Sequence, residues 1–146
     1  MNILGFNLTK IAANRSSKIL PNPMMNTNIE FLDVVKEEIE MLKENDAVKI
    51  TFKFSVDYAD SKEKDKKTPE IEGKVEFEGI IILSASKDEA KDIFKFWKKK
   101  QIPEGIRIPL FNVILRKCSP KALDMEDQIG LPLHLPFPQI QSSKKE

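Results

Sequence analysis

The sequence predicts an α+β domain in which a four-stranded antiparallel sheet carries two C-terminal helices on one face. Residues 70–83 alternate apolar and charged side chains along most of their length, and a period of two is typical of a half-buried strand. Residues 48–58 show the same alternation. After Ser86 the apolar residues recur with the period of a helix, at Ala90, Ile93, Phe94 and Trp97. Because strands come first and helices follow, the order favours an antiparallel sheet with the helices on one side.

Length and composition narrow the classes of protein. A chain of 146 residues is expected to form one domain, here residues 1–146 with a disordered tail at 139–146. The formal net charge of +1 gives no global basic field, so nucleic acid is not an expected partner. The single cysteine fits a reducing compartment. The N-terminus lacks a secretory pattern and no apolar run is long enough to span a membrane, so we expect a cytoplasmic protein.

The first half of the chain contains two further strands. Residues 3–13 alternate apolar and polar side chains and predict the first strand. Residues 14–26 contain two prolines, which lack a donor for a strand ladder, and predict a loop. Residues 27–35 predict the second strand. Residues 36–43 fit either a short helix or a continued strand, and residues 44–46 form a turn before the third strand.

The two clearest strands are expected to pair as a hairpin. The charged residues 60–68 join them as a solvated tip. Antiparallel pairing places the lysines of 48–58 opposite the glutamates of 70–83, and each such pair contributes roughly 0.2–1 kcal/mol. We therefore expect an exposed polar face and a buried apolar face. Gly73 and Gly79 lie within the strand and are typical of a bulge or of a close approach by a neighbouring group.

The first helix has a strong start signal. Ser86 and Glu89 have the S-x-x-E spacing of a capping box. The three lysines at 98–100 follow the helix, where its dipole favours positive charge. Because a residue that precedes proline disfavours the helical region, we expect the helix to end before Ile102-Pro103.

The second helix is predicted to start at Pro109 and to end at Ser119-Pro120. Its residues are apolar nearly all round, so it must be buried on most sides. This favours partial cover by another subunit, with an oligomer interface at Leu110, Ile114 and Cys118. Residues 121–128 predict one more short helical turn. Residues 131–138 alternate proline with large apolar residues, which forces an extended path.

No stretch of the chain has the pattern of a catalytic or metal site. Phosphate-loop, dinucleotide, nucleophile-elbow and metalloprotease motifs are all absent from the sequence. His134 is the only histidine and Cys118 the only cysteine, so we expect structural roles for both and no metal, cofactor or enzymatic activity. The lysines of 62–67 and 98–100 are interpreted as solvated surface, because acidic residues interrupt the first run and the second is short.

Three segments in order resemble the SecB export-chaperone family and its SecB-like relatives. They are Gly79-Ile80-Ile81, Pro109–Cys118 and Leu131–Phe137, and their spacing matches as well as their order. The resemblance extends over residues 6–137. The export chaperones are acidic, whereas this chain is nearly neutral, which favours the relatives that act outside the export system.

The resemblance implies a SecB-like fold, a homo-oligomer (dimer or tetramer) and ATP-independent binding of unfolded polypeptides. It also implies a hydrophobic groove between sheet, crossing loop and helix. Carried over position by position, the groove residues are Met24, Met25, Phe52, Phe54, Phe77, Leu133, Leu135 and Phe137.

Two other functions remain open from the sequence. The first is a small-ligand protein or enzyme that uses the cavity between sheet and helix, which would need Tyr58, His134 and Asp57 to converge. The second is a structural subunit of a larger assembly. A long open apolar groove would favour the chaperone. A closed pocket with convergent polar groups would favour the ligand protein, and a flat patch would favour the structural subunit.

Overall fold

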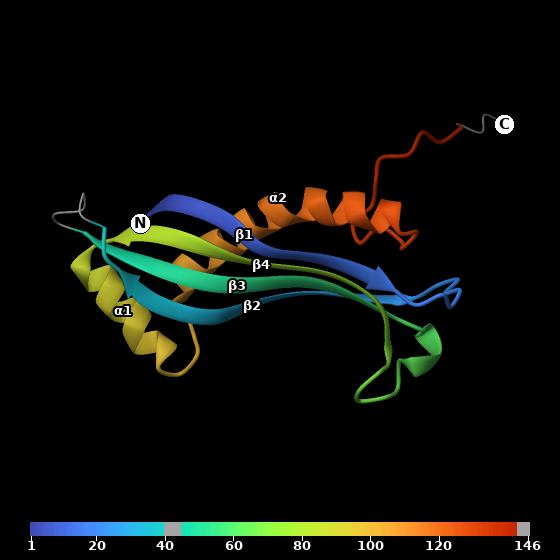
Figure 1. Ribbon diagram of the computed structural model, residues 1–146, viewed down its shortest axis with the longest axis horizontal. Coiled ribbons are helices and arrows are strands. Elements are labelled where there is room, and N and C mark those ends of the chain that lie inside the picture. Colours follow the sequence, from blue (N-terminus) through green and yellow to red (C-terminus); the bar gives the residue numbers. More distant parts are fainter. Residues whose placement is uncertain (40–44, 143–146) are drawn as a thin grey trace.

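The computed structural model of the chain describes residues 1–39 and 45–142. Four long strands precede two helices (Figure 1), and the predicted α+β architecture is confirmed. A short 3-10 helix, η1 (Ser61–Glu63), occupies the tip between the third and fourth strands. The main elements are β1 (Asn2–Arg15), β2 (Met24–Glu37), β3 (Asp46–Ala59), β4 (Ile71–Ala85), α1 (Lys87–Trp97) and α2 (Glu104–Gln128).

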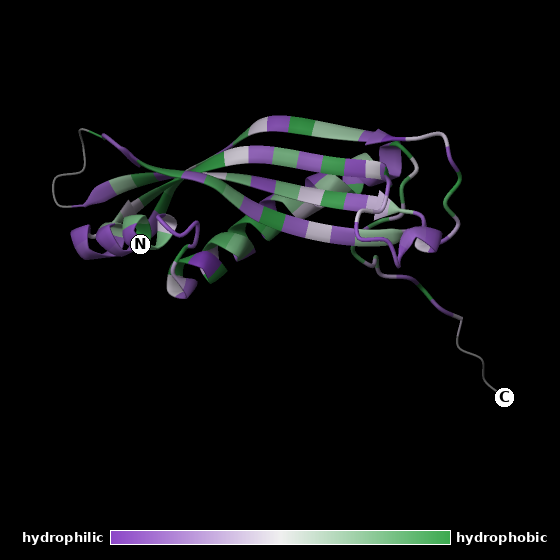
Figure 2. Ribbon diagram, turned by 90° about the horizontal axis from the view of Figure 1, so that it is seen from below, coloured by the Kyte–Doolittle hydropathy of each residue, from purple (hydrophilic) through white to green (hydrophobic). Residues whose placement is uncertain are grey.

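The sheet is antiparallel throughout, with the strand order β1-β4-β3-β2. The β3–β4 hairpin forms its centre, and β1 and β2 form its edges. Since β1 and β2 are consecutive in the chain, the loop of residues 16–23 crosses from one edge to the other at one end of the sheet. Figure 2 shows both helices under the same face of the sheet, as the sequence predicted.

The core lies between that face and the helices. The inward side chains from Val48 to Tyr58 of β3 and from Val75 to Leu83 of β4 are fully buried, and the strands alternate hydrophobic and hydrophilic bands (Figure 2). Gly79 makes this packing possible, because a Cβ there would lie 2.6 Å from the Asn7 carbonyl oxygen and 2.7 Å from Phe52 Cζ. Phe52 in turn packs on Phe6, with ring centres 5.3 Å apart. The predicted close approach at Gly79 is confirmed.

The outer face of the sheet carries the expected cross-strand charges. Glu76 on β4 binds Lys10 Nζ on β1 at 2.6 Å and Lys53 Nζ on β3 at 2.9 Å. These two partners lower the pKa of Glu76 to about 2. The carboxylate is buried although it lies on the polar face. The expectation of a wholly exposed polar face was therefore wrong at this position, because the long lysine side chains from both neighbouring strands reach the carboxylate and cover it.

The helix α1 begins with the predicted capping box. The Ser86 hydroxyl accepts a hydrogen bond from the Glu89 N–H at 3.1 Å, and the Glu89 carboxylate accepts one from the Ser86 N–H at 3.0 Å. Ala90 and Ile93 are buried under the sheet. The helix ends at Trp97, and Lys100 folds back with Nζ 4.8 Å from the centre of the Trp97 ring.

The helix α2 is longer than the sequence predicted. It runs through Ser119-Pro120 without a break, so the expected start at Pro109, the expected end at Pro120 and the separate turn at 121–128 were wrong. A proline inside a helix removes a donor and costs about 3 kcal/mol. The helix persists because every fourth residue packs on the sheet. The buried stripe consists of Ile106, Leu110, Ile114, Cys118, Ala122 and Glu126.

The structure describes only part of two segments, residues 36–43, for which the sequence left helix and strand open, and the predicted tail at 139–146. Lys36 and Glu37 continue β2, which favours the strand interpretation over the helix, and residues 38–39 have no regular structure. Residues 40–44 lie outside the described part of the chain, as do residues 143–146 of the predicted tail. Residues 131–142 contain neither helix nor strand, and the chain bends at residues 134–135, within the segment that was predicted to be extended.

Candidate functional site

A groove follows the side of α2 that faces the edge strand β2. Its largest part, here called the central hollow, has a volume of about 670 Å³. One wall is Thr27 of β2, and another is Leu135 from the segment after α2. The floor comes from α2, through Asn112, Leu115, Arg116, Ser119, Pro120 and Leu123.

One neighbouring hollow extends the groove, and a further hollow lies along β2. The C-terminal hollow, of about 530 Å³, shares Pro120 and Leu123 with the central hollow and is closed by Leu133 and Phe137. The α1 hollow, of about 460 Å³, is lined by residues 29–32 of β2 and by Trp97 and Lys100. Together the hollows line β2 from Thr27 to Leu32 and α2 from Asn112 to Asp127. The central and C-terminal hollows expose mostly apolar surface, although His134 also lines the central one. The charged residues Glu30 and Lys100 line the α1 hollow.

The helix α2 presents one flank to this groove because its buried stripe fixes its rotation. Residues one position beyond the stripe turn toward β2. Phe111 stacks on Phe31 of β2, with ring centres 5.3 Å apart and planes inclined by 2°. Leu115, one turn further, is 39% exposed and lies on the floor of the central hollow. The aromatic stack therefore joins helix to edge strand, and the leucine beside it remains open to a ligand.

Residues 131–137, here called the strap, close the far end of the groove. Leu131 is buried, with Cδ2 2.8 Å from the position that a Cβ on Gly73 would take. The Tyr58 hydroxyl donates a hydrogen bond to the Pro132 carbonyl oxygen at 2.6 Å. The strap then passes over the end of α2, where His134 meets Glu126.

Glu126 and His134 form a buried pair. Nδ1 of His134 lies 2.8 and 2.9 Å from the two carboxylate oxygens, and its backbone N–H donates to one of them at 3.1 Å. The side chain of His134 is 2% exposed and that of Glu126 is 0% exposed. Burial first, and then the nearby Glu126 carboxylate, raises the pKa of Tyr58. This cluster attaches the strap to both β3 and α2.

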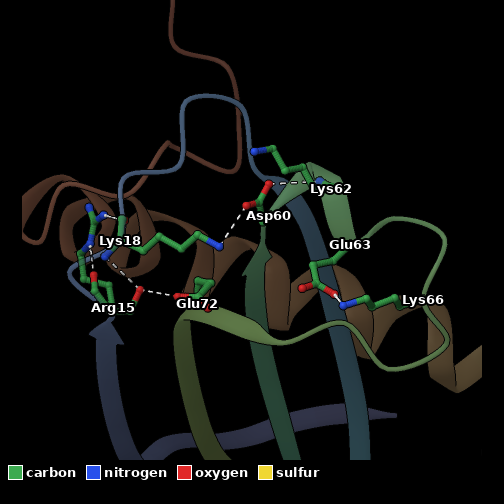
Figure 3. Close-up of polar contacts among 8 residues, drawn as sticks. Arg15, Lys18, Asp60, Lys62, Glu63, Lys66 and Glu72 are labelled. Carbon is green, nitrogen blue, oxygen red and sulfur yellow. Dashed lines mark hydrogen bonds and ion pairs between the residues drawn. The ribbon is translucent and has the colours of Figure 1, made fainter.

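The start of the strap is also fixed from the other sheet edge. Arg15, at the end of β1, donates to the Gly130 carbonyl oxygen at 2.7 Å, just beyond α2. Gly130 has φ +72°, a left-handed conformation that suits glycine after a helix. Figure 3 shows the surrounding ionic contacts, in which Lys18 of the crossing loop binds Asp60 at 3.0 Å. The backbone N–H of Lys62, and then Lys18, lower the pKa of Asp60.

The predicted groove residues divide into three groups. Leu133, Leu135 and Phe137 line the hollows. Met24 and Met25 begin β2; Met25 pairs with the inward-facing Tyr58 and is 46% exposed, while Met24 is partly buried. The third group is fully buried in the core, without surface for a ligand in this structure, and consists of Phe52, Phe54 and Phe77.

The predicted oligomer-interface residues also lie inside the chain. Leu110, Ile114 and Cys118 belong to the buried stripe of α2 and are fully buried against the sheet of their own chain. Burial raises the pKa of the Cys118 thiol to about 11. A helix of 25 residues needs no second subunit to cover this stripe, because strands of 14 and 15 residues provide a long enough face.

Sequence reasoning missed the α2 floor of the groove and the buried acid. Leu115 was recognised only as part of a helix that is apolar all round, and nothing in the sequence links Glu126 to His134.

The convergence required for a ligand protein is incomplete, because Asp57 lies on the opposite face of the sheet, 3.7 Å from Lys74 Nζ. Within residues 1–39 and 45–142, no group of three metal-ligating side chains occurs and no helix is long and apolar enough to cross a membrane.

Comparisons with known proteins add one structural likeness. No protein-family model and no curated protein matches the chain. Among solved structures, the chain is similar to the SecB-like chaperone of Mycobacterium tuberculosis in complex with a ChAD peptide from the HigA1 antitoxin. The two chains are 13% identical, the TM-score is 0.47, and the match covers 98% of this chain and 92% of that chain.

Proposed function

We propose that the protein is an ATP-independent, SecB-like chaperone of the cytoplasm that holds unfolded polypeptides in the groove beside α2. The observation that carries this proposal is the central hollow, an open and mostly apolar surface bordered by an edge strand. Contiguous exposed apolar surface marks sites of interaction with other chains. Burial contributes about 25 cal/mol per Å² of apolar surface and needs no particular sequence, which suits a binder of many clients.

The composition of the groove supports a polypeptide client over a small polar ligand. The floor offers Leu115, Pro120 and Leu123 for apolar side chains. Most polar atoms of the buried cluster bind one another, because Glu126 binds Nδ1 of His134 and the Tyr58 hydroxyl binds the Pro132 carbonyl oxygen. Within this cluster, Nε2 of His134 is the one buried side-chain atom without a hydrogen-bond partner among the described residues. A client would therefore be retained by its apolar side chains.

Light scattering tests the proposal. A chemically denatured model protein is diluted into buffer without ATP, with and without this protein. We expect suppression of aggregation at stoichiometric amounts, and weaker suppression by Leu115→Asp. The matched control is Ile108→Asp, because Ile108 lies on the same helix, is 48% exposed and lines none of the three hollows. Equal suppression by both variants would argue against the groove, and no suppression at several-fold excess would remove the chaperone function.

We also propose that the chain forms a homo-oligomer, a dimer or a tetramer. The support is the free edge of β1, a strand of 14 residues on which Leu4 and Ile11 are exposed. Long unpaired edges with apolar residues favour association. Sedimentation velocity measures the mass directly, and a monomer at micromolar concentration would contradict this proposal without affecting the groove.

A further inference from the structure

We propose that the strap is an intramolecular ligand of the groove, and that clients bind by displacing its outer half. The inference rests on the proposed function, since it concerns the regulation of the same groove. The strap places a large apolar residue at every second position, at Leu133, Leu135 and Phe137, and it has no helix or strand of its own. It is thus an irregular apolar segment that lines the apolar groove of its own chain.

The inner half of the strap is firmly attached. Leu131 fills the space beside Gly73, Pro132 accepts the Tyr58 hydrogen bond, and His134 is held by Glu126 through both its backbone and its ring. The ring of His134 also meets Phe54 edge-on, with centres 6.1 Å apart. Leu131 and the side chains of His134 and Glu126 are buried, so we expect the segment from Leu131 to His134 to stay in place when a client binds.

The outer half has a different environment. The polar anchors described above end at His134, and beyond it Leu135 is 43% and Phe137 is 59% exposed. Both residues nevertheless line the hollows, Leu135 the central one and Phe137 the C-terminal one. They line the hollows together with Pro120 and Leu123, the α2 residues that the two hollows share. A client chain that runs along this part of the floor therefore competes with Leu135 and Phe137 for apolar contact with it.

Tethering makes this competition effective. A segment joined directly to its site has an effective concentration in the millimolar range. When a site is open for only a fraction of the time, the apparent dissociation constant of a ligand rises by the reciprocal of that fraction. The strap therefore weakens, by the same factor, the binding of every client that must displace it.

The experiment compares three forms of the chain by fluorescence anisotropy with one labelled probe, a peptide of residues 131–140 of this sequence. The forms are the full chain, a chain that ends at His134, and the full-length double variant Leu135→Ser with Phe137→Ser. The double variant keeps the length and removes the apolar contacts. Ile140→Ser is the matched control, because Ile140 lies in the same segment, is fully exposed and lines no hollow. Circular dichroism and the denaturation midpoint establish that each form is folded.

We expect the shortened chain and the double variant to bind the peptide about tenfold more tightly than the full chain and the Ile140→Ser control, as for a site about one-tenth open. Equal affinity for all forms would overturn the strap proposal, as would loss of binding in the shortened chain, which would make the outer strap part of the site wall. In either case suppression of aggregation by the full chain would still support the proposed function. Absence of both peptide binding and suppression would overturn both.

Discussion

At Gly79 the sheet has no room for a side chain. The hydrogen of glycine lets Phe52 lie across β4 and lets β1 approach from the other side. An added methyl group would meet a backbone oxygen, which cannot rotate away as a flexible side chain would. Overpacking of this kind typically costs about 1–3 kcal/mol.

We therefore expect Gly79→Ala to lower the free energy of unfolding by about 1–3 kcal/mol, because Phe52 and β1 must both shift. The measurement is urea denaturation followed by circular dichroism. Gly105→Ala is the control, since nothing lies within 4 Å of a Cβ there and alanine in a helix is favoured over glycine by about 1 kcal/mol. A variant at position 79 that is as stable as the parent would contradict the packing described here.

Glu76 predicts a dependence of stability on pH. Its pKa is about 2 in the folded chain against 4.5 for a free side chain, so the unfolded chain takes up the proton first as the pH falls. The stability that Glu76 contributes is complete above pH 4.5 and is lost between about pH 4.5 and pH 2. The Glu76→Gln variant should lack this pH-dependent contribution to the free energy of unfolding. Denaturation at several pH values gives the free energy of unfolding of the parent and of the variant as a function of pH. The two curves should differ near neutrality and converge toward pH 2. A constant difference between them would contradict the prediction.

Among the elements, α1 and α2 show where local sequence determines structure and where it does not. The capping box of Ser86 and Glu89 involves neighbours in the chain, so the start of α1 could be predicted. The extent of α2 depends on contacts with a sheet formed by residues far away in sequence. Those contacts outweigh the helix-breaking tendency of Pro109 and Pro120, which local patterns alone would take as boundaries.

The same reasoning predicts the effect of removing a proline. Pro120→Ala restores a backbone donor one turn beyond Arg116, within a helix that already passes through this position. We expect the melting temperature to rise, with a gain of up to about 3 kcal/mol. Calorimetry measures the melting temperature. Pro138→Ala, in the irregular segment after α2, serves as the control, and we expect it to change the melting temperature little. A lower melting temperature for Pro120→Ala would indicate that α2 is broken at Ser119.

At the scale of the whole molecule, the sequence predicted the sheet, the helices and their common face, but not the boundary between core and groove. Phe54 and Leu135 are both large and apolar, and both fall in segments with strong patterns, yet one is fully buried and the other lines a hollow. The way that the helices and the strap cover the sheet decides between the two outcomes. That cover depends on contacts between segments far apart in sequence, so a linear pattern does not contain it.

Cys118 offers a probe of the whole interface between helix and sheet. The thiol is fully buried at the middle of the α2 stripe, and burial raises its pKa to about 11. We expect labelling by a thiol reagent at pH 8 to be at least about a hundredfold slower in the native protein than in denaturant, because α2 must first leave the sheet. Fast labelling of the native protein would mean that α2 opens readily.

The strand order has a consequence for synthesis on the ribosome. β1 is made first, yet its partner is β4, and Asn2 pairs with Ser84. At about 5–20 residues per second, β1 waits on the order of 10 s for that partner. β2, β3 and β4 can pair in turn as successive hairpins, whereas β1 must stay unpaired while they emerge. The nascent chain thus carries Phe6 and Leu8 on a strand without a partner until the sheet is nearly complete. During that time it exposes apolar side chains, as do the unfolded clients that we propose for the finished protein.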